Sequence, residues 1–383
     1  MNPTRIFSWA LLLAGVSCAV AWAQGDIDYN RARELLQKMK AGQALSSEER
    51  DYVMRAREAR QGRGGRAGSV PAAADAAAPV DAVKVEDLVP LSEMTILHMY
   101  KGEEGGLYGG GRNEPSPEHL AAAMKESAKI VPLDGEGLPS PDGKIVLLGV
   151  GMSNTTQEFR RFKEIADADP AKSPRVVIVD GAQGGQDARL TSDPTAAFWP
   201  RIDERLRQAG VTAKQVQVIW LKQAIARPDG EFPASAKRLQ NYLTTIVGTM
   251  KARYPNARIS YHSSRTFAGY AVTPLNPEPY AYEGAFAVRW LINDQIGGNP
   301  QLNFDPARGE VKAPLLLWGP YLWAQGENPR QGDGLSYTRE DFTAKDGTHP
   351  TASGQQKVAK LLLTFFKTEP TTRGWFVAQE ARR

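Results

Sequence analysis

The sequence has almost no cysteine and little histidine. Among its 383 residues there is one cysteine, Cys18, and there are four histidines. Cys18 lies inside an apolar N-terminal stretch, so the chain beyond that stretch has no thiol for disulfide or redox chemistry. His98, His119, His262 and His349 show none of the spacings at which histidines ligate zinc. We therefore expect no metal and no cofactor.

A large excess of one charge is also missing. The sequence has 47 Lys and Arg against 43 Asp and Glu, a formal net charge of +4. Basic residues interleaved with aromatic ones, which would indicate nucleic-acid binding, do not occur. We expect no nucleic-acid partner. The hydrophobic fraction of 42% and the charged fraction of 23% are typical of globular proteins.

The single long apolar run lies at the N-terminus. Arg5 precedes the apolar stretch from Ile6 to Val20, and Ala21-Trp22-Ala23 has the small-x-small pattern of a cleavage site. The run of about 15 residues is shorter than the roughly 20 that span a bilayer. It predicts a signal peptide over 1–23, and a secreted or periplasmic protein with no membrane span after cleavage. A lipoprotein anchor on Cys18 is the alternative.

Two further segments precede the main domain. Residues 24–61 carry apolar side chains at helical spacing, and Ser46 and Glu49 have the spacing of a capping box, which together predict a helical hairpin. Residues 62–83 consist largely of Gly, Arg, Ala, Pro and Asp and cannot bury much apolar area, so we interpret them as a disordered linker. The main domain is then 84–383.

Within the main domain, apolar strand patterns alternate with helical ones. The strands are expected at 145–150, 175–179, 216–221, 258–262 and 314–318, and the helices at 115–128, 158–168, 198–208, 236–254, 280–296 and 351–366. This alternation predicts an α/β fold in which a five-stranded parallel sheet carries helices on both faces. Right-handed crossovers bring all the carboxyl ends of the strands to one edge, where α/β proteins bind ligands.

Polar residues follow each of these strands. Ser153 follows the first strand, and the others come after later strands: Gly184, Gly185, Gln223, Arg265, Asp346 and His349. A serine becomes a good nucleophile when a histidine base removes its proton and a carboxylate orients that histidine. His349, three residues after Asp346, is the expected base, and His262 at a strand end is a rival. Taken alone, Ser153 would more often be a helix cap.

In these motifs the sequence resembles the SGNH (GDSL-like) hydrolases over roughly 144–366. The resemblance lies in a serine after the first strand, within Gly151-Met-Ser-Asn154, and in Asp346-Gly-Thr-His349 near the C-terminus. It implies a three-layer αβα, flavodoxin-like five-stranded parallel sheet. It also implies Ser153 as nucleophile, His349 as base and Asp346 as its orienting acid. The Gly-x-Ser-Asn form is more similar to the carbohydrate acetylesterase branch than to the lipase-like one.

The resemblance also implies an oxyanion site. Its donors would be the N–H of Ser153, the N–H of Gly184 or Gly185, and a side-chain amide. The family usually has asparagine at the amide position, whereas this sequence has Gln223, with Asn154 as a substitute donor if Gln223 points elsewhere. The glycines are equally consistent with a turn, and Gln223 with a structural amide.

Three residues are candidate substrate contacts. Asn154 lies beside the nucleophile, Arg265 follows the fourth strand, and Tyr108 lies in a glycine-rich stretch where it could form a sugar platform. The alternatives are a salt bridge for Arg265 and, for the stretch around Tyr108, an irregular segment lying over the domain.

The sequence as a whole predicts a secreted serine ester hydrolase. It would remove small acyl groups, such as acetyl, from carbohydrate through an acyl-enzyme, acting on an acylated small molecule or polysaccharide. The alternative is a non-catalytic carbohydrate or cell-surface binding protein on the same scaffold. The substrate's acyl group and alcohol, the role of the hairpin and the oligomeric state do not follow from the sequence.

Overall fold

The computed structural model describes residues 84–378 and a few residues before them, namely Arg31, Glu34, Leu35, Lys38, Glu48, Glu49, Tyr52, Val53 and Ala56. The chain divides into two units, 1–78 and 79–383. In the first unit the described residues are helical, and Lys38 Nζ lies 3.6 Å from Glu49 Oε1. The predicted signal peptide and linker fall outside the described residues. Among those residues, no helix combines the length and the apolar character needed to cross a membrane.

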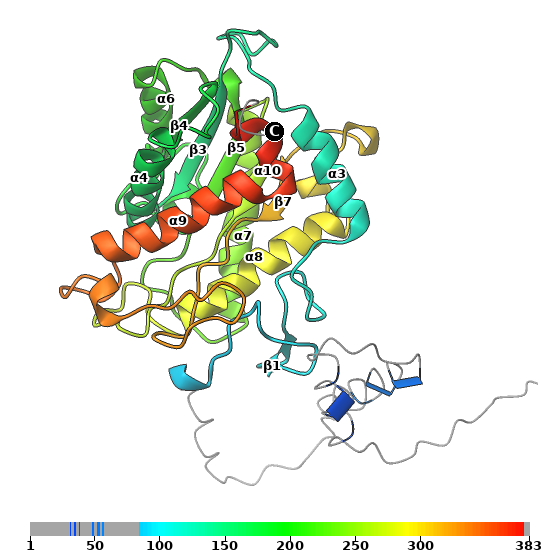
Figure 1. The fold of residues 1–383 in the computed structure, drawn as a ribbon, viewed down its shortest axis with the longest axis vertical. Coiled ribbons are helices and arrows are strands. Elements are labelled where there is room, and N and C mark those ends of the chain that lie inside the picture. The colour runs from blue at the N-terminus through cyan, green and yellow to red at the C-terminus, as the bar shows by residue number, and fades with distance from the viewer. Residues whose placement is uncertain are drawn as a thin grey trace, which may run out of the picture. The chain divides into compact units, whose positions relative to one another are not determined.

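The second unit is built on a five-stranded, all-parallel sheet with strand order β4-β3-β5-β6-β7 (Figure 1). The strands are β3 (Ile145–Gly151), β4 (Val176–Asp180), β5 (Val216–Lys222), β6 (Ile259–His262) and β7 (Leu315–Trp318). In order along the chain this is the 2-1-3-4-5 arrangement of flavodoxin-like folds. The predicted α/β class is therefore confirmed.

Helices cover both faces of the sheet because the strands alternate their apolar side chains between two cores. Along β3, Ile145 and Leu147 face one core, whereas Val146, Leu148 and Val150 face the other. The first core is closed by α3 (Pro117–Ala128), α4 (Ser153–Asp167), α9 (Ala352–Thr368) and α10 (Pro370–Phe376). The second is closed by α6 (Phe198–Gln208), α7 (Ala234–Arg253) and α8 (Tyr280–Ile296).

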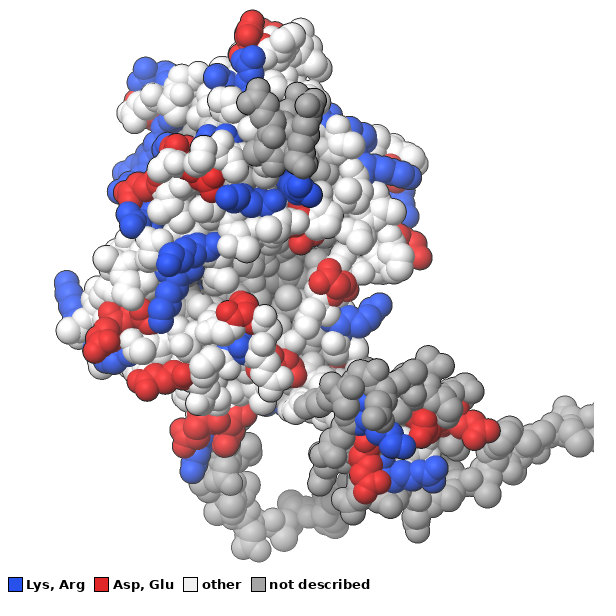
Figure 2. Space-filling view, viewed as in Figure 1, with Lys and Arg blue, Asp and Glu red and all other residues white. Residues whose placement is uncertain are grey.

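The remaining elements are short. They comprise the antiparallel pair β1 (Met99–Tyr100) and β2 (Glu103–Glu104), the helix α5 (Ala188–Thr191), and 3₁₀ helices at Val85–Asp87, Ala213–Gln215, Pro300–Leu302, Pro306–Arg308 and Arg339–Asp341. On the face shown in Figure 2, basic and acidic side chains are interspersed. This agrees with the nearly balanced charge of the sequence.

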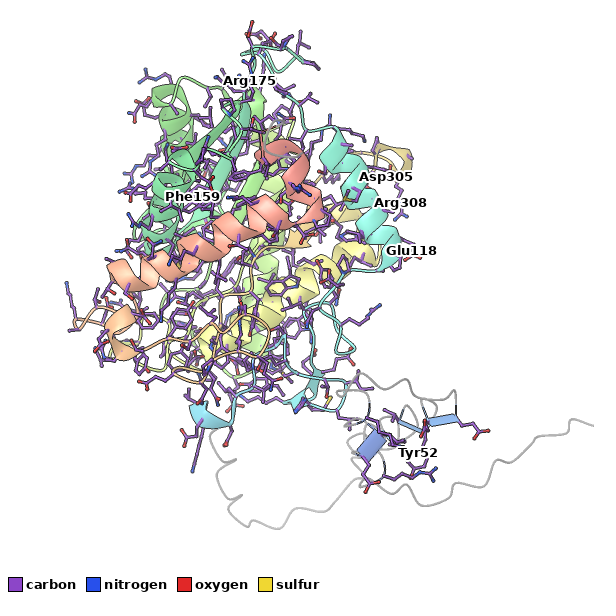
Figure 3. All side chains as sticks on the ribbon, viewed as in Figure 1. Tyr52, Glu118, Phe159, Arg175, Asp305 and Arg308 are labelled. Carbon is purple, nitrogen blue, oxygen red and sulfur yellow. The ribbon has the colours of Figure 1, made fainter. Side chains whose placement is uncertain are left out.

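A glycine in β3 sets how closely α4 approaches the sheet. A Cβ atom on Gly149 would lie 2.5 Å from Cδ1 of Phe159, so only glycine leaves room for that ring. Phe159, labelled in Figure 3, stacks on Trp220 of β5 with ring centroids 5.3 Å apart. This contact fixes α4 against the centre of the sheet, with its N-terminus at the end of β3.

Candidate active site

Ser153, His349 and Asp346 form one line of hydrogen-bonded side chains. The Oγ atom of Ser153 lies 2.7 Å from Nε2 of His349, and Nδ1 of His349 lies 2.6 Å from Oδ2 of Asp346. Ser153 is the first residue of α4, whose cap position is Met152, so the serine is not the helix cap. Both distances are those of strong hydrogen bonds, and the order of groups is that of a nucleophile, a base and an orienting acid.

The histidine reaches the serine because the chain doubles back across the sheet edge. Strands β5 and β6 lie between β3 and β7 in the sheet, so the segment 319–351 must cross them to bring His349 to Ser153. Helix α9, which follows this segment, then packs against α4. Ser153 and His349 are thus carried by elements that pack against each other.

Asp346 is held in its ionised form by the groups around it. Burial alone would raise its pKa, but Oδ1 accepts hydrogen bonds from the backbone N–H groups of His349 (3.0 Å) and Thr348 (2.9 Å) and from the Thr343 hydroxyl (2.7 Å). Together with the His349 side chain, these bonds lower the pKa of Asp346 far below its ordinary value. An ionised Asp346 accepts from Nδ1–H, which leaves Nε2 as the acceptor for the Ser153 hydroxyl.

The turn that carries Asp346 and His349 requires a glycine. Gly347 has φ +64°, and a Cβ atom there would lie 1.8 Å from the carbonyl oxygen of Tyr270. The N–H of Val272 also donates to the carbonyl of Asp346 (3.0 Å). The loop after β6 therefore packs directly on the Asp346–His349 turn and holds it in place.

Backbone N–H groups without a hydrogen-bond partner lie where α4 begins. The first N–H groups of a helix have no partner within it, and Met152 provides no side-chain cap. Gly184 lies opposite, since a Cβ atom on it would be 3.9 Å from Cβ of Ser153. Within residues 84–378, the backbone N–H groups of Ser153 and Gly184 donate no hydrogen bond. Gly185 has φ +75°, which marks it as the turn residue of this pair.

The structure contradicts the predicted oxyanion role of Gln223. Its Nε2 donates to the carbonyl of Gln186 and to the hydroxyl of Thr191, both at 3.0 Å, and its Oε1 accepts from the Ala224 N–H at 3.2 Å. The side chain is 2% exposed. Because both ends of the amide are hydrogen-bonded, Gln223 joins the loop after β4 to the end of β5. It is therefore a structural amide, the alternative given in the sequence analysis.

Asn154 and Arg265 are not placed to touch a substrate. Asn154 is 0% exposed, and its Nδ2 donates to the carbonyl of Thr348 at 2.9 Å. Its Oδ1 accepts from Nη1 of Arg265 at 2.7 Å, and Arg265 is 2% exposed. This burial contradicts the expected substrate contacts, and the bond to Thr348 also excludes Asn154 as the substitute oxyanion donor.

Tyr108 is a structural residue as well. Its ring is buried in the core, and its hydroxyl accepts a hydrogen bond from the N–H of Trp318 at 3.2 Å. Nε1 of Trp318 in turn donates to the carbonyl of Leu107 at 2.7 Å. These bonds fasten the glycine-rich stretch to the end of β7, so the expected sugar platform is wrong and the irregular-segment reading fits.

His262 cannot act as the rival base. It is fully buried, and neither ring nitrogen has a hydrogen-bond partner among the described residues. Burial lowers its pKa to about 3. The imidazole is therefore neutral and makes no hydrogen bond to Ser153, whose hydroxyl contacts His349 instead.

A buried ion pair missed by the sequence analysis lies beneath the site. Lys222, the last residue of β5, donates to Glu158 on α4, and both side chains are buried. Burial lowers the pKa of Lys222 to about 8, with the Glu158 charge opposing that shift. The Thr155 hydroxyl also donates to the Lys222 carbonyl at 2.7 Å. These contacts clamp the first two turns of α4, and hence Ser153, to β5.

Metal ligands are not grouped in the part of the chain that the structure describes: it contains no cluster of three or more His, Cys, Asp or Glu side chains suited to an ion. The hydrogen-bonded line at Ser153 consists instead of one hydroxyl, one imidazole and one carboxylate.

Comparison with known proteins finds similarity in structure alone. No family model matches the chain, and no curated protein matches it in sequence. A Bacteroides fragilis protein proposed to be an acylhydrolase is 14% identical with a TM-score of 0.36, over 68% of this chain and 99% of that one. The periplasmic domain of the Salmonella Paratyphi A lipopolysaccharide acetyltransferase is 12% identical with a TM-score of 0.31, over 64% and 94%. A salicylyl-acyltransferase from a tetracycline biosynthetic pathway is 14% identical with a TM-score of 0.31, over 61% and 58%.

Proposed function

We propose that this chain is a serine ester hydrolase of the SGNH type. The observation that carries the proposal is the continuous hydrogen-bonded line from Ser153 through His349 to Asp346, with contacts of 2.7 and 2.6 Å. This line meets the N-terminus of α4, where unpaired N–H groups and the positive end of the helix dipole favour a developing negative charge. A binding protein would need neither feature.

In the proposed reaction, Ser153 Oγ attacks the ester carbonyl carbon while Nε2 of His349 takes the hydroxyl proton. The N–H groups of Ser153 and Gly184 stabilise the oxyanion of the tetrahedral intermediate. When the intermediate collapses, His349 gives the proton to the leaving alcohol oxygen, and the acyl group stays on Ser153. His349 then deprotonates a water molecule, which attacks the acyl-enzyme and releases the carboxylic acid and the serine hydroxyl.

We further propose that the substrate is an acylated carbohydrate met outside the cytoplasm. The support is the Gly151-Met-Ser-Asn154 motif, which is similar to that of carbohydrate acetylesterases, and the signal-peptide pattern of residues 1–23. The aromatic residues after β7, Tyr321 and Trp323, give no support to sugar stacking because both are buried in the core.

The test is hydrolysis of p-nitrophenyl acetate and of a panel of acetylated sugars by the wild-type protein and by Ser153→Ala. We expect Ser153→Ala to reduce hydrolysis by at least about 10⁴-fold while leaving the circular dichroism spectrum unchanged. Ser140→Ala, in the loop before β3, is the matched control and should retain full activity. Hydrolysis that survives in Ser153→Ala would contradict the mechanism, and a wild-type protein that binds sugars without hydrolysing any ester would favour a binding protein.

A further inference from the structure

Asn154, the residue next to the proposed nucleophile, joins two segments that are distant in the sequence. Its Nδ2 donates to the backbone carbonyl of Thr348, the residue before the proposed base His349, at 2.9 Å. Its Oδ1 accepts from Nη1 of Arg265, in the segment after β6, at 2.7 Å. One amide therefore links the start of α4, the segment after β6 and the turn that carries the imidazole.

Arg265 determines which way this amide points. A guanidinium group donates only, so the oxygen end of the Asn154 amide must face it. The NH₂ end is then directed to the Thr348 carbonyl, which accepts only. With the amide reversed, donors would face donors at Arg265 and acceptors would face each other at Thr348. The arginine thus holds the asparagine in the one orientation that retains the His349 turn.

Burial makes this arrangement stiff. Asn154 and Thr348 are fully buried, and Arg265 is almost so, which leaves solvent little opportunity to replace either hydrogen bond. Nε and Nη2 of Arg265 have no partner within the described residues. Burial lowers the pKa of Arg265, and the negative charges of Glu158, Glu278 and Asp346 oppose that shift.

We propose that Asn154 and Arg265 are a positioning pair that sets the location of the His349 imidazole relative to Ser153. The inference rests on the proposed function for its catalytic meaning, because it gives these residues no contact with the substrate. Thr348 is bonded covalently to His349, so any shift of its carbonyl moves the base. A displacement of about 1 Å between reacting groups costs roughly 100-fold in rate.

Two substitutions separate the two halves of the link. Asn154→Asp keeps an oxygen for Arg265 but loses the NH₂ group that holds Thr348, whereas Arg265→Met keeps the amide but lets it reverse. We expect each to lower kcat for p-nitrophenyl acetate by roughly 10- to 100-fold, with KM unchanged because the substrate is not contacted. Arg265→Lys, which keeps a positive charge and a donor, should recover part of the loss.

The double variant Asn154→Leu/Arg265→Met, compared with each of its single variants, tests whether the two residues act together, since leucine leaves no buried carboxylate without a cation. If the two residues act as one hydrogen-bonded unit, the kcat of the double variant should be close to that of the worse single variant, because the first substitution already breaks the link. A multiplicative loss, with the two single-variant effects combining in full, would overturn the proposed coupling.

Asn276→Asp is the matched control. Asn276 is also a buried asparagine, and its Nδ2 donates to the carbonyl of Ile225 at 3.1 Å, away from the His349 turn. It should lose stability comparably to Asn154→Asp and keep its kcat. If Asn154→Asp does not fold, the comparison of Arg265→Lys with Arg330→Lys replaces it, since Arg330 is a buried arginine that bonds the carbonyls of Tyr321 and Trp323.

A second readout does not depend on hydrolysis. The proton between Nδ1 of His349 and Asp346 should give a downfield NMR resonance, assigned by its loss in His349→Gln. We expect it to broaden or shift in Asn154→Asp and to remain in Asn276→Asp. Unchanged resonance and unchanged kcat in Asn154→Asp would overturn the positioning role. If the wild-type protein has no esterase activity but its resonance still shifts in Asn154→Asp, the positioning role is supported. In that case only the proposed function is contradicted.

Discussion

The Nε2 atom of His349 lies 2.7 Å from the Oγ atom of Ser153, although the two residues are 196 positions apart in the sequence. Nothing local brings them together: one begins the helix after the first strand of the sheet, and the other lies in the segment after the last. The contact is produced by the topology of the sheet and by the return of residues 319–351 across its edge.

Asp346→Asn should leave the turn nearly intact and remove most of the activity. The amide oxygen would keep the backbone N–H groups of Thr348 and His349 as donors, so the NH₂ group would face Nδ1 of His349. Nδ1 would then accept and Nε2 would carry the proton, which leaves no acceptor for the Ser153 hydroxyl. We expect kcat for p-nitrophenyl acetate to fall by about 10⁴-fold with little change in KM. Asp169→Asn, which breaks a bond to Lys367 (2.7 Å) remote from the site, should alter stability alone. Equal kcat values for these two variants would exclude the orienting role.

Gln223→Ala distinguishes a structural amide from an oxyanion donor. Removal of an oxyanion donor costs roughly 10²- to 10³-fold in kcat. Because the Gln223 amide is bonded to Gln186 and Thr191, we expect a loss below about 10-fold in kcat, and a decrease of about 1–3 kcal/mol in the free energy of unfolding. Gln217→Ala, which removes a buried amide bonded to Val131, is the control for stability. A kcat loss of two orders of magnitude would restore the oxyanion role.

Lys222→Met should be strongly destabilising, because it leaves the Glu158 carboxylate buried without its cation. The expected decrease in the free energy of unfolding is about 3–5 kcal/mol, measured by urea denaturation. Lys222→Met/Glu158→Leu removes both charges and should recover much of that loss. A double variant that is less stable than Lys222→Met would show that Glu158 has another partner which stabilises its charge.

His262 should make the protein less stable in acid. Its pKa in the folded protein is about 3, below the ordinary 6.5, so between those values the unfolded chain binds the additional proton. Stability attributable to this residue is therefore complete above pH 6.5 and declines as the pH falls, by up to about 1.4 kcal/mol per pH unit. His262→Phe should flatten the dependence of the urea midpoint on pH between 6.5 and 4.5, and a slope equal to that of the wild type would contradict this.

Asp346 acts in a lower pH range. Its folded pKa lies far below the ordinary 3.8, so the stability it contributes is present above that value and is lost as the pH falls below it. The two ranges are thus separable in one pH titration, because the His262 experiment ends at pH 4.5, above the range in which Asp346 affects stability.

The strands were predictable because β3, β4 and β7 read as nearly continuous apolar runs, and β5 is mostly apolar. The start of α4 was not. The predicted helix began at residue 158, whereas α4 begins at Ser153, because its first turn is polar and bonds to distant groups rather than showing an apolar stripe. Thr155, for example, donates to the Lys222 carbonyl.

The candidate site divides in the same way. The positions of Ser153, Asp346 and His349 follow from strand order, which the sequence pattern carries. The directions of Asn154, Gln223 and Tyr108 depend on partners far along the chain, such as Thr348, Thr191 and Trp318. Residue type and place in the sequence give no information on such a partner. The sequence therefore suggests substrate contacts for Asn154 and Tyr108 and an oxyanion role for Gln223, whereas all three hold parts of the fold together.

The long separation between Ser153 and His349 also bears on when the protein first becomes active. Strands β4 to β7 all lie between the two residues in the sequence, so the two side chains can meet only when the entire sheet has assembled. A nascent chain that has been synthesised only as far as β7 would hold a serine without a base. Recovery of the proposed esterase activity during refolding would accordingly follow assembly of the whole sheet and of the turn that carries His349.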